Sequence, residues 1–332
     1  MTALILGVGY VGSALAALLI DRGERVVALD NFFSTDESAV RGLDGPERLE
    51  IVRGSIADPA ALEAAFAAAR GAEVVYNLAA QSSARPDAAS PEYTEETNLR
   101  GPRLVLEAQQ RFGVRTQVYA SSLRVYGDNL PANADESVPY GRFSDLSHLS
   151  KAYGEKLLEM HVGLAGGEIR GRSVRLGLVY GPAPVMKVDY RFMTAPNKFC
   201  LQVARGEELS VWGDTRLGLI HVEDAARALL LAADSGLGDY AAANAASEVT
   251  TVPEVARLVA EAAAERGLAV LIRPDLPPSR RPIEGMPSRL TGLGYEPRHR
   301  LREGLAETLD YFLTRVVAPP YGRHQGDGDS RG

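Results

Sequence analysis

Several features are scarce in this sequence, and each scarcity excludes a class of protein. There is one cysteine, Cys200, so an internal disulfide framework and a cysteine-based metal cluster are both excluded. The formal net charge is −7, which argues against a large non-specific nucleic-acid surface. No stretch reaches about 18 uninterrupted apolar residues, the length that spans a membrane as a helix. The sequence therefore predicts no nucleic-acid partner, no membrane span and no metal site.

The N-terminal segment is apolar enough to resemble a targeting signal. Residues 1–20 carry no charged side chain, but they also lack the basic region and the cleavage-like site of a secretory signal. Three glycines at fixed spacing further distinguish the segment from a smooth hydrophobic helix. We therefore expect a cytoplasmic protein.

The remaining composition is that of a folded α/β protein. The 332 residues are 45% hydrophobic and 24% charged, which is ordinary for a globular chain. This length is sufficient for one large domain with a smaller lobe.

Short apolar runs alternate with helical stretches over the first half of the chain. Near-continuous apolar strands are typical of a parallel sheet covered by helices on both faces. Right-handed crossovers then predict a doubly wound, Rossmann-type α/β fold. The expected strands are residues 2–6, 25–29, 49–53, 73–77, 116–120 and 173–179. The expected helices are residues 10–22, 59–70, 93–112 and 147–160.

The regular alternation stops after Gly181, where prolines become frequent. We expect the Rossmann domain to comprise residues 1–180 and about 220–245. A smaller α/β substrate lobe is expected from about 181–219 and 246–316. Residues 317–332 are rich in glycine and charge, which predicts a flexible tail.

A glycine-rich turn follows the first expected strand. Gly7, Gly9 and Gly12 form a G-x-G-x-x-G pattern that opens a helix, the context in which this motif binds a dinucleotide. The helix N-terminus supplies free N–H groups and partial positive charge for a pyrophosphate. Asp30 closes the second strand, where a carboxylate accepts hydrogen bonds from the adenosine ribose and repels a 2′-phosphate. These residues predict NAD as the cofactor.

From here the chain resembles the extended short-chain dehydrogenase/reductases, the NAD-dependent nucleotide-sugar epimerases and dehydratases. Residues 197–202 and 209–213 look most like the branch containing UDP-sulfoquinovose synthase. The resemblance covers residues 4–309, and its motifs occur in family order. They are the glycine turn, Asp30-Asn31, residues 77–80, Asn98, Ser121-Ser122, residues 125–127, Ser150-Lys151, Glu155, Arg175, residues 179–182 and residues 220–224.

The resemblance implies a role for each matching residue. Ser122 would hydrogen-bond the sugar hydroxyl that is oxidised, and Lys151 would bind the nicotinamide ribose and lower the pKa of the catalytic base. The cofactor contacts it implies are Gly7, Gly9, Tyr10, Val11, Gly12, Asp30, Asn31, Ser55, Ile56, Leu78, Ala79, Ala80, Asn98 and Lys151. The expected substrate contacts are Gln81, Ser83, Arg124, Asn197, Trp212, Arg216 and Arg281. Many relatives are homodimers, and we expect the same here.

One departure from the family pattern concerns the catalytic base. The family places a tyrosine four residues before the lysine, and this position is Ser147. An alcohol is far less acidic than a phenol, whose pKa is about 10. Three interpretations stay open: the proton passes through Ser147 to a group such as His148, Tyr140 fills the gap, or the oxidation step is lost or slowed.

A second departure bears on the reaction. Family dehydratases place Asp-Glu after the serine or threonine, and decarboxylases keep a glutamate there, whereas this chain has Leu123-Arg124. Without that acid, dehydration and decarboxylation are disfavoured, while epimerisation through a transient keto-sugar needs no such group. The leading hypothesis is therefore an NAD-dependent nucleotide-sugar epimerase. The alternatives are a catalytically weak NAD-binding sensor or interaction protein, and another redox reaction of the dehydratase, oxidoreductase or sulfosugar-synthase type.

Overall fold

The computed structural model of the protein describes residues 1–43, 48–233, 236–274 and 283–316, so the predicted tail, residues 317–332, lies outside the described residues. Among these residues, the central sheet has seven parallel strands in the order β10-β6-β5-β4-β1-β2-β3. In that order the strands are Tyr240–Ala245, Arg170–Leu176, Thr116–Ser122, Val74–Asn77, Thr2–Leu6, Arg25–Asp30 and Leu49–Arg53. Their buried, largely apolar residues form the middle of the sheet. The expected doubly wound fold is confirmed.

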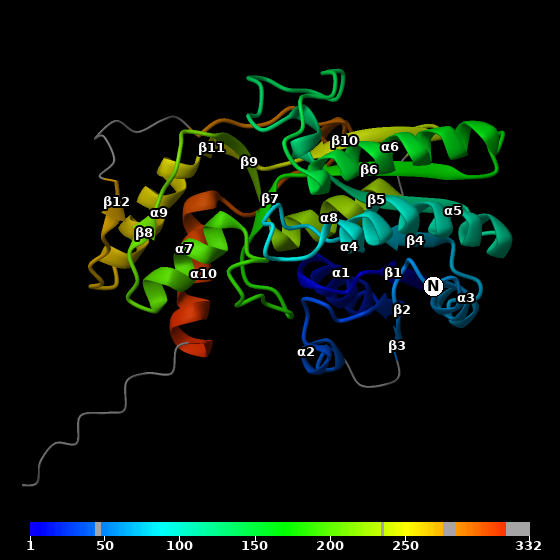
Figure 1. Cartoon of the computed structure of the whole chain (residues 1–332), viewed down its shortest axis with the longest axis horizontal. Coiled ribbons are helices and arrows are strands. Elements are labelled where there is room, and N and C mark those ends of the chain that lie inside the picture. The colour runs from blue at the N-terminus through cyan, green and yellow to red at the C-terminus, as the bar shows by residue number, and fades with distance from the viewer. Residues whose placement is uncertain (44–47, 234–235, 275–282, 317–332) are drawn as a thin grey trace, which may run out of the picture.

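Helices cover both faces of this sheet (Figure 1). On one face, α1 (Tyr10–Asp21) packs beside α8 (Val222–Ala233) over a shared apolar cluster. The other face carries α3 (Pro59–Ala68), α5 (Gly101–Phe112) and α6 (Leu146–Leu164). A short helix, α2 (Glu37–Arg41), follows β2.

The helix expected over residues 93–112 is interrupted. The structure has α4 (Pro91–Glu95), a π-helical turn (Glu96–Arg100) and then α5. Pro102 lacks an N–H donor, and its ring crowds the carbonyl of Asn98 four residues earlier. A π-turn is one way to accommodate this interruption. The sequence pattern identified the helical stretch but not this break.

The strand expected over residues 173–179 is two strands in different sheets. β6 ends at Leu176, and β7 (Leu178–Tyr180) joins β9 (Arg216–His221) and β11 (Glu248–Thr251) in a second sheet. Gly177 lies at the change of direction, where a Cβ would be 2.8 Å from the carbonyl oxygen of Gly218. Glycine is needed there because the two backbones approach so closely.

A second apolar core lies beyond this sheet. It is built mainly by α7 (Ala195–Ala204), α9 (Val252–Ala264) and α10 (Leu301–Arg315), which occupy the left side of Figure 1. A two-stranded sheet of β8 (Leu209–Ser210) and β12 (Ile272–Arg273) completes this part. The chain returns to the central sheet in α8 and β10 between these elements. Within the described part of the chain, no helix is long and apolar enough to cross a membrane.

Candidate active site

A cavity of about 580 Å³ lies between the carboxyl ends of the parallel strands and the second core. In doubly wound folds, ligands bind at this edge of the sheet. The cavity is lined by the glycine turn, by the ends of β2, β4 and β5, by the start of α6, and by residues 176–179, 187, 191–195 and 215–218. Most of the residues predicted for the cofactor and the substrate therefore share one cavity.

The glycine turn is shaped for close backbone approach. Gly7 has a φ of +90°, and a Cβ there would lie 2.6 Å from the backbone nitrogen of Ala79. A Cβ on Gly12 would lie 2.1 Å from the carbonyl oxygen of Gly7. No larger residue fits either position without a shift of backbone. The tight turn holds the start of α1 against the sheet at the cavity lining, where the N-terminus of a helix is a suitable cradle for a pyrophosphate.

Asp30 is held at the end of β2 beside this turn. Its carboxylate accepts the backbone N–H of Val8 at 2.8 Å and that of Phe32 at 2.7 Å. Burial raises the pKa of Asp30, and these hydrogen bonds with the charge of Lys187 partly oppose that rise. A carboxylate lining the cavity here fits the adenosine ribose.

The remaining residues predicted for the cofactor divide into lining and supporting side chains. Asn31, Ser55, Ile56, Leu78, Ala79 and Ala80 line the cavity. Asn98 does not line it, and instead its Oδ1 accepts the backbone N–H of Gln81 at 2.8 Å while its Nδ2 donates to the Gln81 carbonyl. Asn98 therefore fixes the loop that follows β4.

Lys151 lies on α6 at the other end of the cavity. Its Nζ donates to the carbonyl oxygen of Ala120 at 2.8 Å, which directs the side chain toward the end of β5. Burial lowers the pKa of Lys151 to about 8, a shift that the nearby charge of Glu155 partly opposes. Ser122, at the end of β5, lines the cavity with Lys151.

Ser147 lines the same region but does not cap the helix. The N-cap of α6 is Asp145, whose side chain accepts the backbone N–H of His148 at 2.9 Å. Ser147 is buried, and its Oγ donates to the carbonyl oxygen of Gln81 at 3.2 Å. Its hydroxyl proton is thus used to hold the β4 loop.

His148 and Asp145 form a polar pair at the cavity wall. Nδ1 of His148 is in direct contact with Oδ2 of Asp145, and His148 lines the cavity. Burial raises the pKa of Asp145, but hydrogen bonds from the side chain and backbone of His148 outweigh it and hold the pKa below its ordinary value. An ionised Asp145 favours a proton on Nδ1, so Nε2 is the nitrogen free to accept one.

Tyr140 is not brought to the cavity lining. Its hydroxyl donates to Oε2 of Glu155 at 3.0 Å. Glu155 is fully buried and also pairs with the guanidinium of Arg175 at 2.8 Å. Burial, followed by the charge of Glu155, raises the pKa of Tyr140. The geometry therefore does not favour Tyr140 as a proton acceptor for a ligand in this cavity.

The residues predicted for the substrate are split by the structure. Gln81, Ser83, Arg124, Asn197 and Arg216 line the cavity. Trp212 does not line it and is 81% exposed. Arg281 lies outside the described residues. Sequence reasoning missed Lys187, Arg191 and Phe192, which line the cavity from the segment between β7 and α7. The chain has only four lysines, and this scarcity is the only feature of the sequence that points to Lys187.

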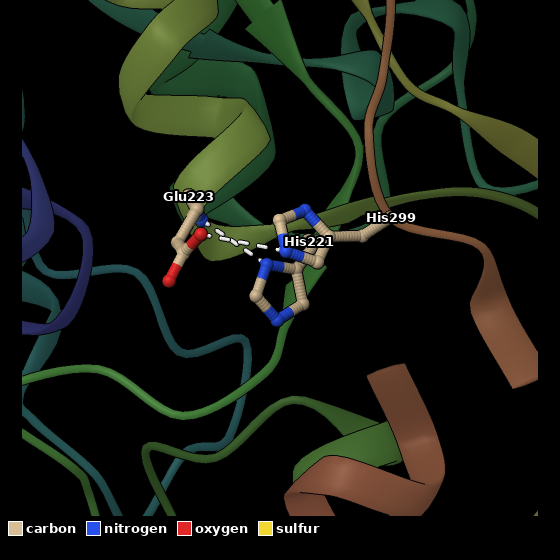
Figure 2. A group of neighbouring side chains, drawn as sticks. All are labelled: His221, Glu223 and His299. Carbon is tan, nitrogen blue, oxygen red and sulfur yellow. Dashed lines mark hydrogen bonds and ion pairs between the residues drawn. The ribbon is translucent and has the colours of Figure 1, made fainter. Parts of the chain in front are cut away.

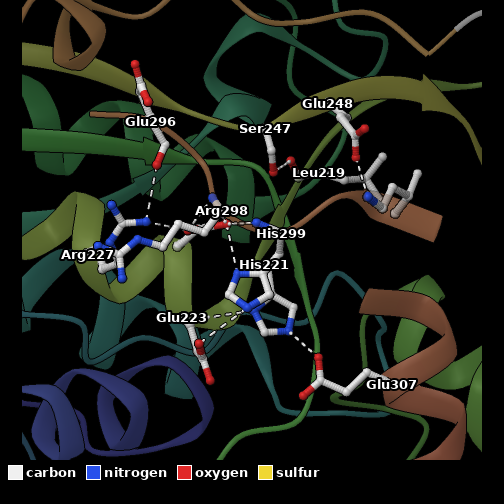
Figure 3. Close-up of polar contacts among 12 residues, drawn as sticks. Leu219, His221, Glu223, Arg227, Ser247, Glu248, Glu296, Arg298, His299 and Glu307 are labelled. Carbon is white, nitrogen blue, oxygen red and sulfur yellow. Dashed lines mark hydrogen bonds and ion pairs between the residues drawn. The ribbon is translucent and has the colours of Figure 1, made fainter. Parts of the chain in front are cut away.

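A second polar cluster lies where α8 begins. Nδ1 of His221 accepts the backbone N–H of Glu223 at 3.3 Å, and the ring stacks on His299 with centroids 3.8 Å apart (Figure 2). Nδ1 of His299 lies 3.1 Å from Oδ2 of Asp224, and Glu307 faces His221 from α10 (Figure 3). Burial and the neighbouring His299 lower the pKa of His221 to about 4.

Ligand atoms of His221, Glu223 and His299 fall within 4.8 Å of one another, close enough for one metal ion. However, the imidazoles face each other, whereas two metal-bound rings direct their edges at the ion. Nδ1 of His221 is also engaged with the backbone of α8. We therefore interpret this cluster as structural, joining α8 to the chain before α10.

The fold and the cavity are those of an NAD-binding enzyme that acts on nucleotide sugars. Comparison with known proteins agrees with this class. The sequence profile of the NAD dependent epimerase/dehydratase family matches residues 3–243. This chain belongs to that family, its cofactor is NAD, and the predicted resemblance is confirmed.

Individual relatives include both epimerases and decarboxylases. The chain is 30% identical to a UDP-glucose 4-epimerase of Streptomyces lividans over 68% of this chain and 69% of that protein. It is 27% identical to UDP-glucuronic acid decarboxylase 1 of Arabidopsis thaliana over 96% of this chain and 71% of the relative. The structure of Thermus thermophilus UDP-glucose 4-epimerase in complex with NAD aligns with a TM-score of 0.80 and 28% identity, covering 95% of this chain and all of that one.

Proposed function

We propose that this protein is a nucleotide-sugar epimerase that works through a transient keto-sugar. The observation that carries the proposal is that Ser122, Lys151 and His148 line one end of the cavity that holds the glycine turn and Asp30. The residues expected to hold the cofactor and the polar groups for oxidising a sugar hydroxyl thus line one cavity. Gly7, Gly9, Gly12 and Asp30 would hold NAD, which when bound would supply the hydride acceptor for the oxidation and the hydride donor for the reduction.

The proton of the sugar hydroxyl is assigned to the pair of His148 and Asp145. Asp145 holds a proton on Nδ1 of His148, which leaves Nε2 as the base. Ser147 is poorly suited to this role because its hydroxyl is buried and already donates to the Gln81 carbonyl. Ser122 orients the hydroxyl, and the ammonium of Lys151 stabilises negative charge as the proton leaves.

The choice of epimerisation rests on the two residues after Ser122. Leu123 is buried and apolar, and Arg124 lines the cavity with its guanidinium bonded to the carbonyl of Asp128. Neither can protonate a leaving hydroxyl. A keto-sugar formed here is therefore reduced again rather than dehydrated. Arg124 offers positive charge to an anionic part of the substrate.

A homodimer is part of the same proposal. The outer side of α6 carries Leu149, Tyr153, Met160 and Leu164, all exposed apolar side chains. Their spacings of four, seven and four residues place them along one stripe of the helix. A second copy of α6 would cover this stripe. We also place the enzyme in the cytoplasm, as the sequence pattern predicts.

The test is incubation of the purified holoenzyme with UDP- and dTDP-sugars, with products identified by proton NMR. Conversion of one sugar to its epimer supports the proposal. A dehydrated or decarboxylated product would show that another reaction occurs at the site.

The replacement of the usual tyrosine by Ser147 favours a second candidate, an NAD-binding protein with little catalysis. NAD binding without conversion of any sugar in the panel would support that candidate.

A further inference from the structure

The segment between β7 and α7, residues 181–194, crosses the cofactor side of the cavity, and we call it the crossing segment. It begins beside α1. There the hydroxyl of Tyr10 donates to the carbonyl of Gly181 at 2.5 Å, and the N–H of Val185 donates to Oγ of Ser13 at 3.2 Å. These contacts fasten one end beside the glycine turn.

The other end of the crossing segment is fastened to loops of the central sheet. The ring of Phe192 meets the ring of Phe33 edge to face, with centroids 5.9 Å apart. Oγ of Ser83 donates to the carbonyl of Arg191 at 2.6 Å, and Nη1 of Arg191 donates to the carbonyl of Asp87 at 3.2 Å. The segment therefore reaches from the glycine turn to the loops after β2 and β4, across the predicted path of the dinucleotide.

Lys187 lies in the middle of this segment and lines the cavity. Its ammonium stands 5.6 Å from the centre of the Phe192 ring, and within the described parts of the chain no hydrogen bond or ion pair reaches it. Burial lowers its pKa, partly opposed by the charge of Asp30. A partly buried cation that lines a cavity without a hydrogen-bonded partner among the described residues is suited to an anionic ligand.

The surroundings of Lys187 indicate which anion it meets. Asp30, whose charge acts on Lys187, accepts the N–H of Val8 within the glycine turn at 2.8 Å. Lys187 lines the same cavity as the glycine turn, and it follows Val185, whose N–H donates to Ser13 of α1, so it lies near this turn. Those groups offer only partial charges, and the described residues of the turn contain no cationic side chain.

We propose that Lys187 is the counter-ion of the dinucleotide pyrophosphate and that the crossing segment thereby retains NAD in the protein. The 2′-phosphate of NADP is the other anionic group of a dinucleotide that would pair with a lysine. Asp30 disfavours that source, because its carboxylate would repel the extra phosphate. The inference rests on NAD as the cofactor and not on the proposed epimerisation.

The test replaces Lys187 by methionine, which keeps the length and removes the charge. Lys198→Met is the matched control, because Lys198 lies on α7, outside the cavity lining, against the ring of Tyr190. Holoenzyme is loaded with NADH, and the loss of its bound fluorescence is followed after addition of excess NAD. Equilibrium affinities for NAD, NADP and adenosine are measured in parallel. No sugar is needed, so the result is independent of the reaction.

We expect Lys187→Met to weaken NAD binding at least tenfold and to speed NADH release, with adenosine binding unchanged. The affinity of NAD should also become less sensitive to salt, since one ion pair is lost. Lys187→Arg should restore affinity to within a few-fold, and Lys198→Met should match the parent protein. NAD affinity within twofold of the parent in Lys187→Met would overturn the proposal. A loss confined to NADP would overturn it in favour of the 2′-phosphate.

Discussion

The pair of Asp145 and His148 can be tested by a substitution that separates its two roles. Asp145 caps α6 through Oδ1, which accepts the N–H of His148 at 2.9 Å, and contacts Nδ1 of the same residue through Oδ2. Asparagine caps helices about as well as aspartate, so Asp145→Asn should change the free energy of unfolding by less than about 0.5 kcal/mol. Its amide group would donate to Nδ1 and force the proton of the ring onto Nε2, the nitrogen that must accept one.

The wrong tautomer should remove most of the general-base contribution. That contribution is typically about 10²–10⁴-fold, or about 3–5 kcal/mol in the activation barrier. The loss of a tautomer-fixing aspartate in a serine protease has an effect of about 10⁴. We therefore expect kcat to fall at least about 100-fold, with KM little changed because the substrate contacts remain.

The assay is the initial rate of epimer formation followed by NMR, with thermal unfolding measured on each variant. Asp128→Asn is the control, because Asp128 accepts a hydrogen bond from Ser144 at 2.9 Å and belongs to the same acidic cluster. If the reaction needs only negative charge in this cluster, Asp145→Asn and Asp128→Asn should lose activity equally. If Asp145→Asn and His148→Ala both keep the parent rate within threefold, the pair is not the base.

Three further outcomes are expected from the same structure. Ser147→Tyr restores the phenol of the family. A rise in turnover would show that serine slows the reaction, whereas a loss of turnover would show that the space beside Ser147 is needed for the substrate or for a different base. Burial lowers the pKa of Lys151 to about 8, so its charge is lost and kcat should decline as pH rises above about 8. The variant Lys151→Met should lose most of the rate and should no longer show this decline with pH. Glu155→Ala leaves buried Arg175 without its carboxylate partner and should cost about 3–5 kcal/mol, a fall in Tm of about 4–7 °C for a chain of this length. Glu159→Ala on the exposed surface should cost less than about 1 kcal/mol.

The parts predicted well from the sequence are those set by local pattern. The apolar runs indicated the strands of the central sheet, and the glycines of residues 7–12 indicated the turn, because both depend on neighbouring residues. The break in the helix before Pro102 also has a local cause, but the helix propensities of the residues do not predict a π-helical turn at this position. The switch of sheet at Gly177 depends on contact with Gly218, forty-one residues away. Periodicity contains no information about such a contact.

The site shows the same division between local and distant causes. The resemblance to the family implied the roles of Ser122 and Lys151 and identified Ser147 as the tyrosine position, and all three line the cavity from β5 and α6. Lys187 was missed because its place depends on the crossing segment packing against Ser13 and Phe33. Trp212 was expected to contact the substrate, yet it is exposed and lies outside the cavity lining. The role of Asp145 needed the three-dimensional contact with His148.

The most direct test of the central claim is rapid mixing of the holoenzyme with nucleotide sugars in D₂O. Absorbance at 340 nm reports NADH, and NMR identifies the product. The account predicts transient absorbance, one inverted carbon and no deuterium at that carbon, because the same hydrogen leaves and returns. Bound NAD with no absorbance change and no altered sugar across the panel would contradict the enzymatic account. Deuterium at a sugar carbon would contradict a simple epimerisation by hydride return.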